Sequence, residues 1–393
     1  MTPPTTHLAL PFFDEAHRQL GERLAQWIPQ QHIDESDDHQ ACQQWVQLLG
    51  THDWLRYCVP AGEDGAWGGA LPKLDSRALV ILRETLAFHS PLADFAFAMQ
   101  GLGSGAITLA GTPDQQAAYL PQVASGKKIA AFALSEADAG SDAGAMSTTA
   151  TRTAKGWVIN GSKTWISNGG IADFYVVFAK TDPAAGTRGI TAFIVDADAP
   201  GLDSSERITV MAPHPLATLA FTACALPESS QLGALHGGFK LAMQTLDIFR
   251  ASVAGAAIGM ARRALAEAVA YSKQRKMFGQ TLADFQLTQA RFGEMVALID
   301  AAALLTYRAA WLRDESERLG TTVRVTAEAA MAKMTATENA QRVIDMALQM
   351  HGGLGVKVGV KIESLYRNIR SLRIYEGATE VQQLIIGKAV LQA

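Results

Sequence analysis

Cysteine is scarce in this 393-residue chain, which contains only Cys42, Cys58 and Cys224. Three widely spaced cysteines offer neither the paired ligands of a zinc site nor the even number of a disulfide framework. The N-terminus lacks the basic start and continuous apolar run of a signal peptide, and no segment reaches the roughly 18 apolar residues that a membrane span needs. These absences predict a cytoplasmic protein with no metal site and no membrane partner.

An excess of positive charge is also missing, because 34 Lys and Arg are outnumbered by 38 Asp and Glu. The formal net charge is -4, the isoelectric point is near 6.2, and the basic clusters are short and interrupted by apolar residues. A nucleic-acid partner is therefore not expected. The remaining composition, with 48% hydrophobic and 18% charged residues, is that of a globular protein with a large core and two or three domains.

A dinucleotide-binding fingerprint is not found either, since that motif needs a strand, a Gly-rich turn and a helix in succession. The two Gly-rich stretches, GLGSG at 101–105 and HGGLGV at 351–356, both lie next to helical patterns. On pattern alone each is a helix terminator or a tight turn. The sequence therefore does not predict a Rossmann fold.

Hydrophobic periodicity divides the chain into three regions. Residues 1–128 show apolar spacings of three and four, which are typical of amphipathic helices. Residues 129–240 carry β-branched and aromatic residues in short runs between turn residues, and the pair Asn160-Gly161 predicts a hairpin turn. Residues 241–393 return to long helical stripes that indicate a bundle. Helices, then antiparallel strands, then helices predict an α+β protein with segregated layers.

Five short segments resemble, in order and spacing, those of the acyl-CoA dehydrogenase family, over nearly the whole chain. They are FALSEADAGSD at 132–142, KTWISNGG at 163–170, DIFR at 247–250, RKMFG at 275–279 with Gln286 downstream, and QMHGG at 349–353 followed by IYEGATE at 374–380. The resemblance implies an N-terminal helical domain at 1–128, a middle antiparallel β-barrel or sandwich at 129–240 and a C-terminal four-helix bundle at 241–393. It also implies a homotetramer, a dimer of dimers, that binds FAD and an acyl-CoA thioester.

Dehydrogenation of a thioester between its α and β carbons needs a base, a flavin N5 to take the β hydride, and donors that polarise the carbonyl. Glu376 matches the catalytic carboxylate of the family's Tyr-Glu-Gly motif, and with an ordinary pKa of roughly 4.3 it is ionised at neutral pH. On pattern alone it is equally a first-turn glutamate stabilised by a helix dipole. Some members carry the base just before the arginine of DIFR, where this chain has Phe249, which cannot accept a proton.

The resemblance also assigns the contacts of both ligands. The positions that match cofactor contacts are Phe132, Leu134, Ser135, Gly140, Ser141, Trp165, Ile166, Ser167, Arg275, Phe278, Gln286, Gln349, Gly352, Gly353, Ala378 and Glu380. The positions that match substrate contacts are Ser141, Asp247, Arg250, Tyr375 and Gly377, with Arg250 also directed at the base. Structural alternatives are strand packing for Trp165, a surface ion pair for Arg275, an intrahelical pair with Asp247 for Arg250 and a solvent-facing charge for Glu380.

Two departures from the family pattern bear on these assignments. Ala378 stands where a threonine usually follows Tyr-Glu-Gly, so the flavin contact expected there is in doubt. The loop reads Ser135-Glu136-Ala137 without the proline that often follows the glutamate, which predicts a looser loop.

The resemblance favours a soluble dehydrogenase that passes its electrons to an electron-transfer flavoprotein. Three alternatives stay open: a dehydrogenase of a carrier-protein-bound acyl group, an oxidase, and a flavin-containing binding protein without turnover. The mildly acidic composition disfavours the nucleic-acid-linked form of the last.

Overall fold

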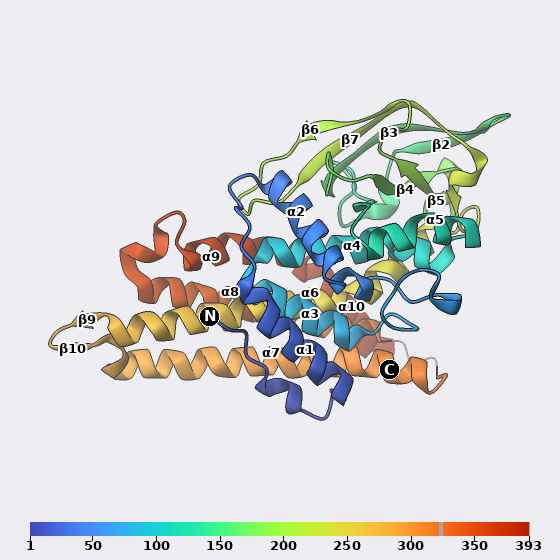
Figure 1. Cartoon of the computed structure of the whole chain (residues 1–393). Helices are drawn as coiled ribbons and strands as arrows, with labels where there is room; N and C mark the ends of the chain where they lie inside the picture. Colours follow the sequence, from blue (N-terminus) through green and yellow to red (C-terminus); the bar gives the residue numbers. More distant parts are fainter. Residues whose placement is uncertain (322–324, 393) are drawn as a thin grey trace. The chain divides into compact units, whose positions relative to one another are not determined.

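The computed structural model describes residues 1–321 and 325–392 (Figure 1). Its residues form two compact units, each assembled from separate stretches of the chain. The bundle unit comprises Met1–His32, Ser76–Asp94 and Arg250–Ala393, and the sheet unit comprises Ile33–Asp75 and Phe95–Phe249. Helices α4 (Pro91–Ala110) and α6 (Gly238–Gln274) contribute residues to both units.

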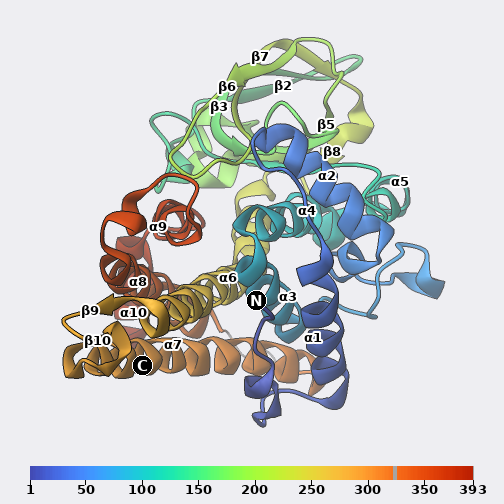
Figure 2. The same cartoon turned by 60° about the vertical axis from the view of Figure 1, so that its left-hand side comes forward.

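The bundle unit consists of long helices and one short hairpin. Its elements are α1 (Glu15–Trp27), α3 (Ser76–His89), the C-terminal part of α6, β9 (Lys276–Met277), β10 (Gln280–Thr281), α7 (Gln286–Arg318), α8 (Thr326–His351), α9 (Lys361–Leu372) and α10 (Thr379–Gln392). Helix α8 contacts α7, α9 and α10, while α3 contacts α1 and α7 (Figure 2). Helix α8 is therefore the element around which the C-terminal helices assemble.

Small residues let the bundle helices approach closely. The buried face of α8 is made largely of alanine, at Ala329, Ala330, Ala332, Ala336, Ala340 and Ala347. On α6 a Cβ at Gly255 would lie 2.8 Å from the carbonyl oxygen of Val80, and one at Gly259 would lie 2.1 Å from that of Glu84. Any side chain at these two positions would push α6 away from α3, so glycine sets the spacing of these two helices.

The sheet unit is built around an eight-stranded sheet. The strands are β1 (Ala130–Ala133), β2 (Thr149–Thr153), β3 (Gly156–Ser167), β4 (Phe174–Lys180), β5 (Ile190–Asp196), β6 (Leu202–Arg207), β7 (Leu216–Leu226) and β8 (Gln231–Leu232). Their order is β6-β7-β3-β2-β4-β5-β8, with β1 paired to β4. All pairs are antiparallel except β1 with β4 and a single residue pair between β2 and β4.

The core of the sheet unit lies against β4 and β5, whose apolar runs FYVVFA and ITAFIV are buried on both faces. Phe174, Val176 and Phe178 of β4 pack in one cluster with Leu120 and Val123 of α5 (Pro113–Ala124). Helix α2 (Asp38–Thr51) belongs to the same unit. These two continuous apolar strands therefore form the buried side of the sheet, between β2 and β8 in the strand order.

The hairpin predicted at Asn160-Gly161 is wrong. These residues lie inside β3, and the turn joins β2 to β3 ahead of them, with Thr153 opposite Gly156. The pairing of β3 with β7 shifts register between Ile159 and Gly161, which marks a β-bulge. A Cβ at Gly161 would lie 2.6 Å from Oγ1 of Thr148, so the glycine serves close packing at the bulge.

The predicted division into helices, sheet and helices is confirmed by these elements. The statement that no segment could span a membrane needs correction, because Gln286–Ser316 in α7 is long enough and contains an 18-residue window with a mean hydropathy of 1.4. Core helices of soluble proteins meet the same criterion, and Met295, Ile299 and Tyr307 of α7 lie in the core of the bundle unit. Composition here is weak evidence for a membrane span.

The N-terminus of α3 is capped by a carboxylate from α7. Asp314 accepts the backbone N–H groups of Ser76 and Arg77 at 2.8 and 3.0 Å, and the Arg77 Nε at 3.1 Å. We expect Asp314→Asn to lower the free energy of unfolding by about 2 kcal/mol, because it neutralises the buried carboxylate of the cap and leaves the Arg77 guanidinium only Asp14 at 3.2 Å and Glu315 at 3.9 Å. Urea denaturation followed by circular dichroism measures this loss.

Glu315→Gln is the matched control for Asp314→Asn. The Glu315 side chain is more exposed, at 20%; it pairs with the largely exposed Arg318 at 2.8 Å and reaches Arg77 only at 3.9 Å. Its loss should cost less than about 1 kcal/mol. Equal losses for the two variants would contradict the capping role.

Candidate active site

Glu376 lies in a tight turn between α9 and α10, with its backbone in the left-handed region. Its φ is 52°, and that of Gly377 is 93°. A non-glycine residue in this region is strained by about 1–3 kcal/mol and persists only where its surroundings hold it. A Cβ at Gly377 would lie 2.3 Å from Nε2 of Gln382, so glycine is needed there. The turn therefore depends on contacts from the helices around it.

Glu338 on α8 closes the base of this turn. Its carboxylate accepts hydrogen bonds from Nε of Arg373 at 2.8 Å and from Oγ1 of Thr379 at 2.6 Å. The backbone N–H of Thr379 also donates to the carbonyl of Arg373 at 3.1 Å. The Glu338 carboxylate thus links the two ends of the turn. The hydroxyl of Thr379, the residue after Ala378, makes one of these two hydrogen bonds.

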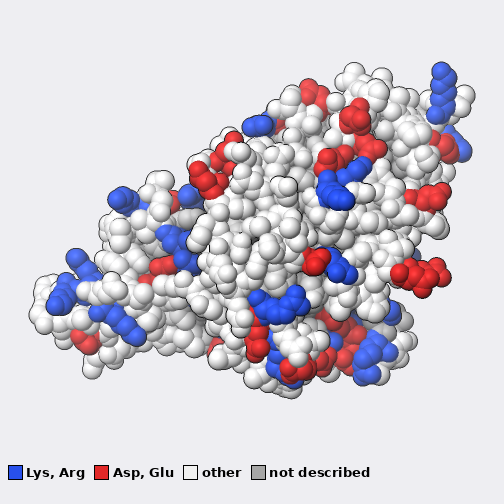
Figure 3. Space-filling view, in the orientation of Figure 1, with Lys and Arg blue, Asp and Glu red and all other residues white. Residues whose placement is uncertain are grey.

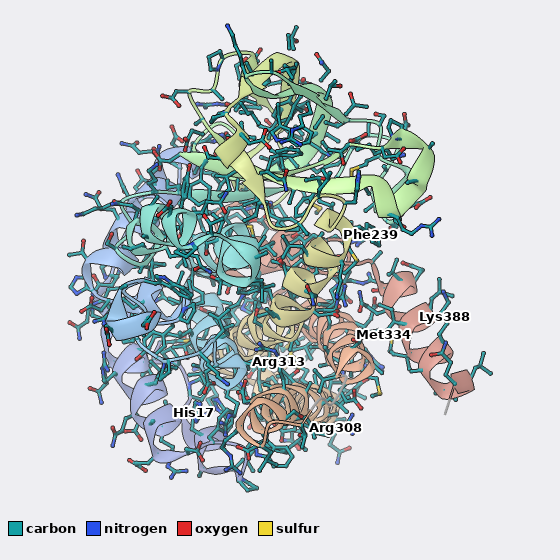
Figure 4. The ribbon with its side chains drawn as sticks, turned by 90° about the vertical axis from the view of Figure 1, so that its right-hand side faces the viewer. His17, Phe239, Arg308, Arg313, Met334 and Lys388 are labelled. Carbon is teal, nitrogen blue, oxygen red and sulfur yellow. The ribbon has the colours of Figure 1, made fainter. Side chains whose placement is uncertain are left out.

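The carbonyl oxygen of Gly377, in the middle of the turn, accepts two further hydrogen bonds. Nζ of Lys333 donates from α8 at 2.8 Å, and Nε2 of Gln382 donates from α10 at 2.9 Å. Both donor residues are fully buried, and burial lowers the pKa of Lys333 to about 8. Figure 4 labels Met334, the next residue on α8, and Lys388 on α10, and so locates the two helices.

The carboxylate of Glu376 is shielded from solvent and unpaired. Neither oxygen has a hydrogen-bond partner among the residues that the structure describes. Burial raises the pKa of Glu376 above its ordinary value of 4.5, while the positive charges of Arg83, Lys333 and Arg250 oppose this rise. A carboxylate with a raised pKa is a stronger base, as the removal of a proton from carbon requires.

The predicted residues Arg250, Tyr375 and Gly377 do come together with Glu376 in the bundle unit. Nε of Arg250 lies 3.4 Å from the carbonyl oxygen of Glu376. Arg250 is 6% exposed, so its charge is held inside the fold beside the turn. This contact is with the backbone of the turn that carries Glu376.

A buried ion pair that the sequence did not indicate lies beside the same turn. Arg83 on α3 donates to both oxygens of Asp94, at 2.8 and 3.0 Å, and to Oγ of Ser252 at 3.1 Å. Its guanidinium also interacts with the hydroxyl of Tyr375, whose pKa burial raises. The residue before the base is therefore fixed by a pair that is almost completely buried.

In the sheet unit, Glu136 anchors the predicted flavin loop at 132–142. Its carboxylate accepts the N–H and hydroxyl of Ser147 at 2.6 and 2.8 Å, the N–H of Thr148 at 3.0 Å and Nζ of Lys163 at 2.8 Å. Nζ of Lys163 also donates to the carbonyl of Leu134 at 2.9 Å. Burial alone would raise the pKa of Glu136, but Lys163 and these donors lower it to about 2. These hydrogen bonds of Glu136 hold the loop in place, although the loop lacks the proline that is often present in the family.

The predicted flavin-facing strand contains a second irregularity of β3. Its pairing with β7 shifts register between Lys163 and Ile166, and Trp165 between them has a φ of 59°. The Trp165 side chain is 57% exposed, whereas a tryptophan packed in a strand would be buried. Ser167 is half-buried. The bulge thus presents a flat aromatic surface and a nearby hydroxyl on the outside of the sheet.

The side chains of two predicted cofactor residues are buried. Leu134 is 8% exposed and packs in the core of the sheet unit, and Ile166 is 1% exposed. Their side chains are directed into the protein, so only their backbones are available to a ligand. For Ile166 the physical reason is the alternation of strand β3, with Trp165 outward and Ile166 inward.

The two segments predicted to hold the adenine and diphosphate lie at one end of the bundle unit. The ring of Tyr271 on α6 stacks on His351 at the end of α8, with 4.4 Å between the ring centroids. Arg275 follows Tyr271 by one helical turn, and Gly352 and Gly353 follow His351 directly. Lys and Arg gather at the end of the molecule where β9 and β10 lie (Figure 3).

The groups at this end of the bundle unit fit the adenine and diphosphate of FAD, and the exposed aromatic ring and hydroxyl on β3 of the sheet unit separately fit its flavin ring. Arg275 is exposed and makes no ion pair with a described residue, so its guanidinium is available to a phosphate. A Cβ at Gly352 or Gly353 would meet nothing within 4 Å, which leaves the backbone open to close approach. Phe278 is 88% exposed at the hairpin tip, with Gln286 and Gln349 also exposed. Aromatic surfaces, hydroxyls and one open cation are the donor set that a flavin dinucleotide needs.

The predicted site residues divide between the two units. The bundle unit carries Arg250, Arg275, Phe278, Gln286, Gln349, Gly352, Gly353, Tyr375, Glu376, Gly377, Ala378 and Glu380. The sheet unit carries Phe132, Leu134, Ser135, Gly140, Ser141, Trp165, Ile166, Ser167 and Asp247. Glu380 is exposed, at the start of α10.

One group of possible metal ligands occurs in the described part of the chain, at Asp37, Asp38 and His39. Asp37 caps α2 by accepting the backbone N–H groups of His39 and Gln40 at 3.0 and 3.1 Å. Nδ1 of His39 lies 2.9 Å from the Asp38 carboxylate. These contacts give the group a structural use at a helix end.

A shielded carboxylate on a fixed turn, together with a donor set for a flavin dinucleotide, defines a flavin-dependent oxidoreductase.

Sequence models of the acyl-CoA dehydrogenase N-terminal, middle and C-terminal domains match residues 13–127, 131–224 and 236–391. The 3-(aryl)acrylate reductase of Clostridium sporogenes is 37% identical to this chain, over 97% of the chain and 100% of that protein. Subunit CarC of the caffeyl-CoA reductase-Etf complex of Acetobacterium woodii is 39% identical, over 84% and 87% respectively.

Solved structures agree with these matches. Butyryl-CoA dehydrogenase from Megasphaera elsdenii gives a TM-score of 0.85 at 32% identity, over 96% of this chain and 99% of that chain. An acyl-CoA dehydrogenase complexed with FAD from Bacillus anthracis gives 0.88 at 28% identity, over 100% and 69% respectively. The chain belongs to the acyl-CoA dehydrogenase family. It is an FAD-dependent oxidoreductase, as the resemblance of the five segments predicted.

Sequence reasoning missed the residues that hold the base in place. Lys333, Glu338 and Gln382 fix the turn, and Arg83 with Asp94 lies beside it. One signal was available, because Lys333 interrupts an otherwise apolar stripe of alanines on α8. The other residues gave no signal, since polar side chains in helices are usually exposed.

The anchor of the flavin loop generates a prediction for the sheet unit. Glu136→Gln should lower the free energy of unfolding by about 3–5 kcal/mol, because it leaves the ammonium of Lys163 buried without a counter-charge. The folded pKa of Glu136 lies below its unfolded value of 4.5, so its stabilising contribution is complete above pH 4.5 and is lost toward pH 2. Denaturation at several pH values measures both effects.

Glu228→Gln is the control for Glu136→Gln, since Glu228 pairs with Arg152 on the exposed surface of the same unit. That variant should lose less than about 1 kcal/mol. The double variant Glu136→Gln with Lys163→Met should recover part of the loss. A single variant as stable as wild type would contradict the anchoring role.

Proposed function

We propose that the protein dehydrogenates an acyl-CoA thioester to the trans-2-enoyl-CoA, with Glu376 as the base that removes the α proton. The supporting observation is the state of the Glu376 carboxylate, which is shielded from solvent and has no hydrogen-bond partner among the described residues. When bound, FAD accepts the β hydride. Acyl-CoA dehydrogenation is the reaction type of the family, and the geometry of the turn supports Glu376 as its base.

The residues around Glu376 have distinct tasks in this proposal. The main-chain N–H of Glu376 is the proposed donor to the thioester carbonyl, where it makes the α proton more acidic. Arg250 holds positive charge against the turn, which favours the anionic base over its protonated form. Burial acts against Arg250 by raising the pKa of Glu376. The balance leaves a carboxylate that is more basic than an exposed one.

A proposed electron acceptor follows from one relative. Subunit CarC of Acetobacterium woodii is named as part of a reductase-Etf complex, and its 39% identity supports an electron-transfer flavoprotein as the partner of this chain. The protein would then pass two electrons per substrate to that flavoprotein. This partnership is favoured over direct reaction with oxygen, which would make the protein an oxidase.

Reduction of a 2-enoyl thioester is a second candidate function. Two of the relatives are named 3-(aryl)acrylate reductase and caffeyl-CoA reductase, which describe hydrogenation of an α,β double bond. The same residues serve both directions, because a base that removes the α proton returns it in reverse. The steady-state ratio of forward to reverse rates, with saturated and unsaturated forms of one thioester, distinguishes the two.

Assembly into a homotetramer and a cytoplasmic location are also proposed. Large apolar side chains are exposed on two helices of the bundle unit, at Leu287, Val296 and Leu304 of α7 and at Leu384, Val390 and Leu391 of α10. Surfaces of this kind favour association of identical chains. All three cysteines are buried and none forms a disulfide, as expected in a reducing compartment.

Glu376→Gln tests the base directly. In anaerobic titration with short, branched, cyclic and aryl acyl-CoA thioesters, we expect the variant to bind the thioester that bleaches the wild-type flavin. Its rate of bleaching should fall on the order of 10²–10⁴-fold, since an amide cannot accept the proton. Flavin absorbance at each addition measures both binding and reduction.

Glu22→Gln is the control for Glu376→Gln, because Glu22 is exposed on α1 of the same unit and belongs to no predicted site. It should bleach at nearly the wild-type rate. Bleaching that survives Glu376→Gln would place the base elsewhere, and a flavin that no thioester bleaches in the wild type would favour a binding protein without turnover.

The pH dependence of kcat/KM gives an independent prediction, because it reports the pKa of the base in the free enzyme. Burial raises the pKa of Glu376, so the acid limb should lie above pH 4.5 and activity should fall about tenfold for each unit below it. Glu376→Asp should keep an acid limb at a lower rate. An acid limb at or below pH 4.5 would show that the carboxylate is exposed.

A further inference from the structure

Lys333 is a charged residue on the buried face of α8, which is otherwise made largely of alanine. The residue is 0% exposed, on the helix face that also carries Ala329, Ala332 and Ala336. Removing a charged amine from water is costly unless the structure gives it a partner. Within the bundle unit, the hydrogen-bond acceptor of Nζ is the carbonyl oxygen of Gly377, at 2.8 Å.

The Gly377 carbonyl does not need this charge to satisfy its hydrogen bonding. Nε2 of Gln382 already donates to the same oxygen at 2.9 Å. A charged donor adds a stronger bond, which is worth roughly twice a neutral one. The ammonium of Lys333 therefore adds a stronger hydrogen bond than the Gly377 carbonyl needs in order to be paired. This bond acts on the strained turn that carries Glu376.

We propose that Lys333 is a positioning residue for catalysis, whose charged form holds the Gly377 carbonyl and thereby keeps Glu376 in its left-handed conformation with the carboxylate shielded. The proposal rests on the proposed role of Glu376 as the base. Glu376 has a φ of 52° and so needs an external hold, whereas Gly377 next to it adopts its φ of 93° without strain. The Lys333 bond joins the centre of the turn to α8, while Glu338 of the same helix joins its ends.

The charges that face Lys333 come from every element packed around it. They are Glu376 in the turn, Arg250 on α6, Glu338 on α8 and Glu380 on α10. Three carboxylates favour the ammonium and one guanidinium opposes it, but burial outweighs them and lowers the pKa of Lys333 to about 8. The hold should therefore weaken as pH rises through about 8, because the neutral amine keeps only an ordinary hydrogen bond.

The test compares Lys333→Gln, Lys333→Arg and the surface control Lys388→Gln on α10 (Figure 4) in the flavin-loaded enzyme. Lys333→Gln keeps a donor but removes the charge, and we expect kcat to fall about 10–100-fold with KM nearly unchanged, since a base displaced by about 1 Å loses that much rate. Lys388→Gln should match the wild type. An unchanged kcat in Lys333→Gln overturns the proposal.

The pH profile of kcat separates Lys333 from the other buried lysine, Lys163, whose pKa burial also lowers to about 8. Wild type should show an alkaline limb near pH 8. Lys333→Arg carries a guanidinium that does not titrate in this range, so its alkaline limb should move above pH 9. A limb that stays near pH 8 in Lys333→Arg overturns the proposal, even if Lys333→Gln fails to fold.

A readout that does not depend on turnover follows from linkage. The folded pKa of Lys333, about 8, lies below its unfolded value of 10.5, so the folded state releases this proton first and gains stability as pH rises between these values. The thermal midpoint of the wild type relative to Lys333→Gln should therefore rise from pH 8 to pH 10. No relative rise would show that Lys333 is not buried as a titrating amine.

Failure of this proposal is distinguishable from failure of the proposed function. If Glu376→Gln still bleaches the flavin, the base lies elsewhere and the proposed function fails. If Glu376→Gln abolishes bleaching but Lys333→Gln and Lys333→Arg behave as wild type, only the positioning role fails. Gln382→Met removes the neutral donor alone, and an effect as large as that of Lys333→Gln would show that the charge has no special role.

Discussion

The carbonyl oxygen of Gly377 is the point on which the geometry of the base depends. Glu376 is strained in the left-handed region, and nothing in its local sequence beyond the glycine favours that conformation. Helices α8 and α10 supply two buried donors to that oxygen, and Glu338 closes the turn below it. The strain is tolerated because helices that are themselves well packed hold the turn from two sides.

The same interaction recurs in the sheet unit. Lys163 is buried, donates to the carbonyl of Leu134 at 2.9 Å and pairs with Glu136, and so holds the loop at 132–142. In both units a buried ammonium fixes a main-chain carbonyl of a loop that the family resemblance assigns to the active site. Burial makes each bond strong, and it also brings the pKa of both lysines to about 8. Rigidity and sensitivity to alkaline pH thus have one physical origin.

Glu376 shows how a carboxylate can become more basic although positively charged side chains lie near it. Burial raises its pKa, and Arg83, Lys333 and Arg250 lower it. These cations bond to other partners, namely Asp94 for Arg83, the Gly377 carbonyl for Lys333 and the Glu376 carbonyl for Arg250. Their charge therefore reaches the carboxylate without a hydrogen bond to it, which leaves its oxygens free to accept a proton.

The sequence by itself determined the order of helices, strands and helices, the family, and the identity of Glu376 as the candidate base, because periodicity and short motifs are local properties of the chain. It placed a hairpin at Asn160-Gly161 where the sheet has a bulge, since register depends on pairing with β7. Only the tertiary structure decided that Leu134 points inward, and that Lys333, Glu338 and Gln382 hold the turn. Their roles arise from contacts between helices, which sequence spacing does not encode.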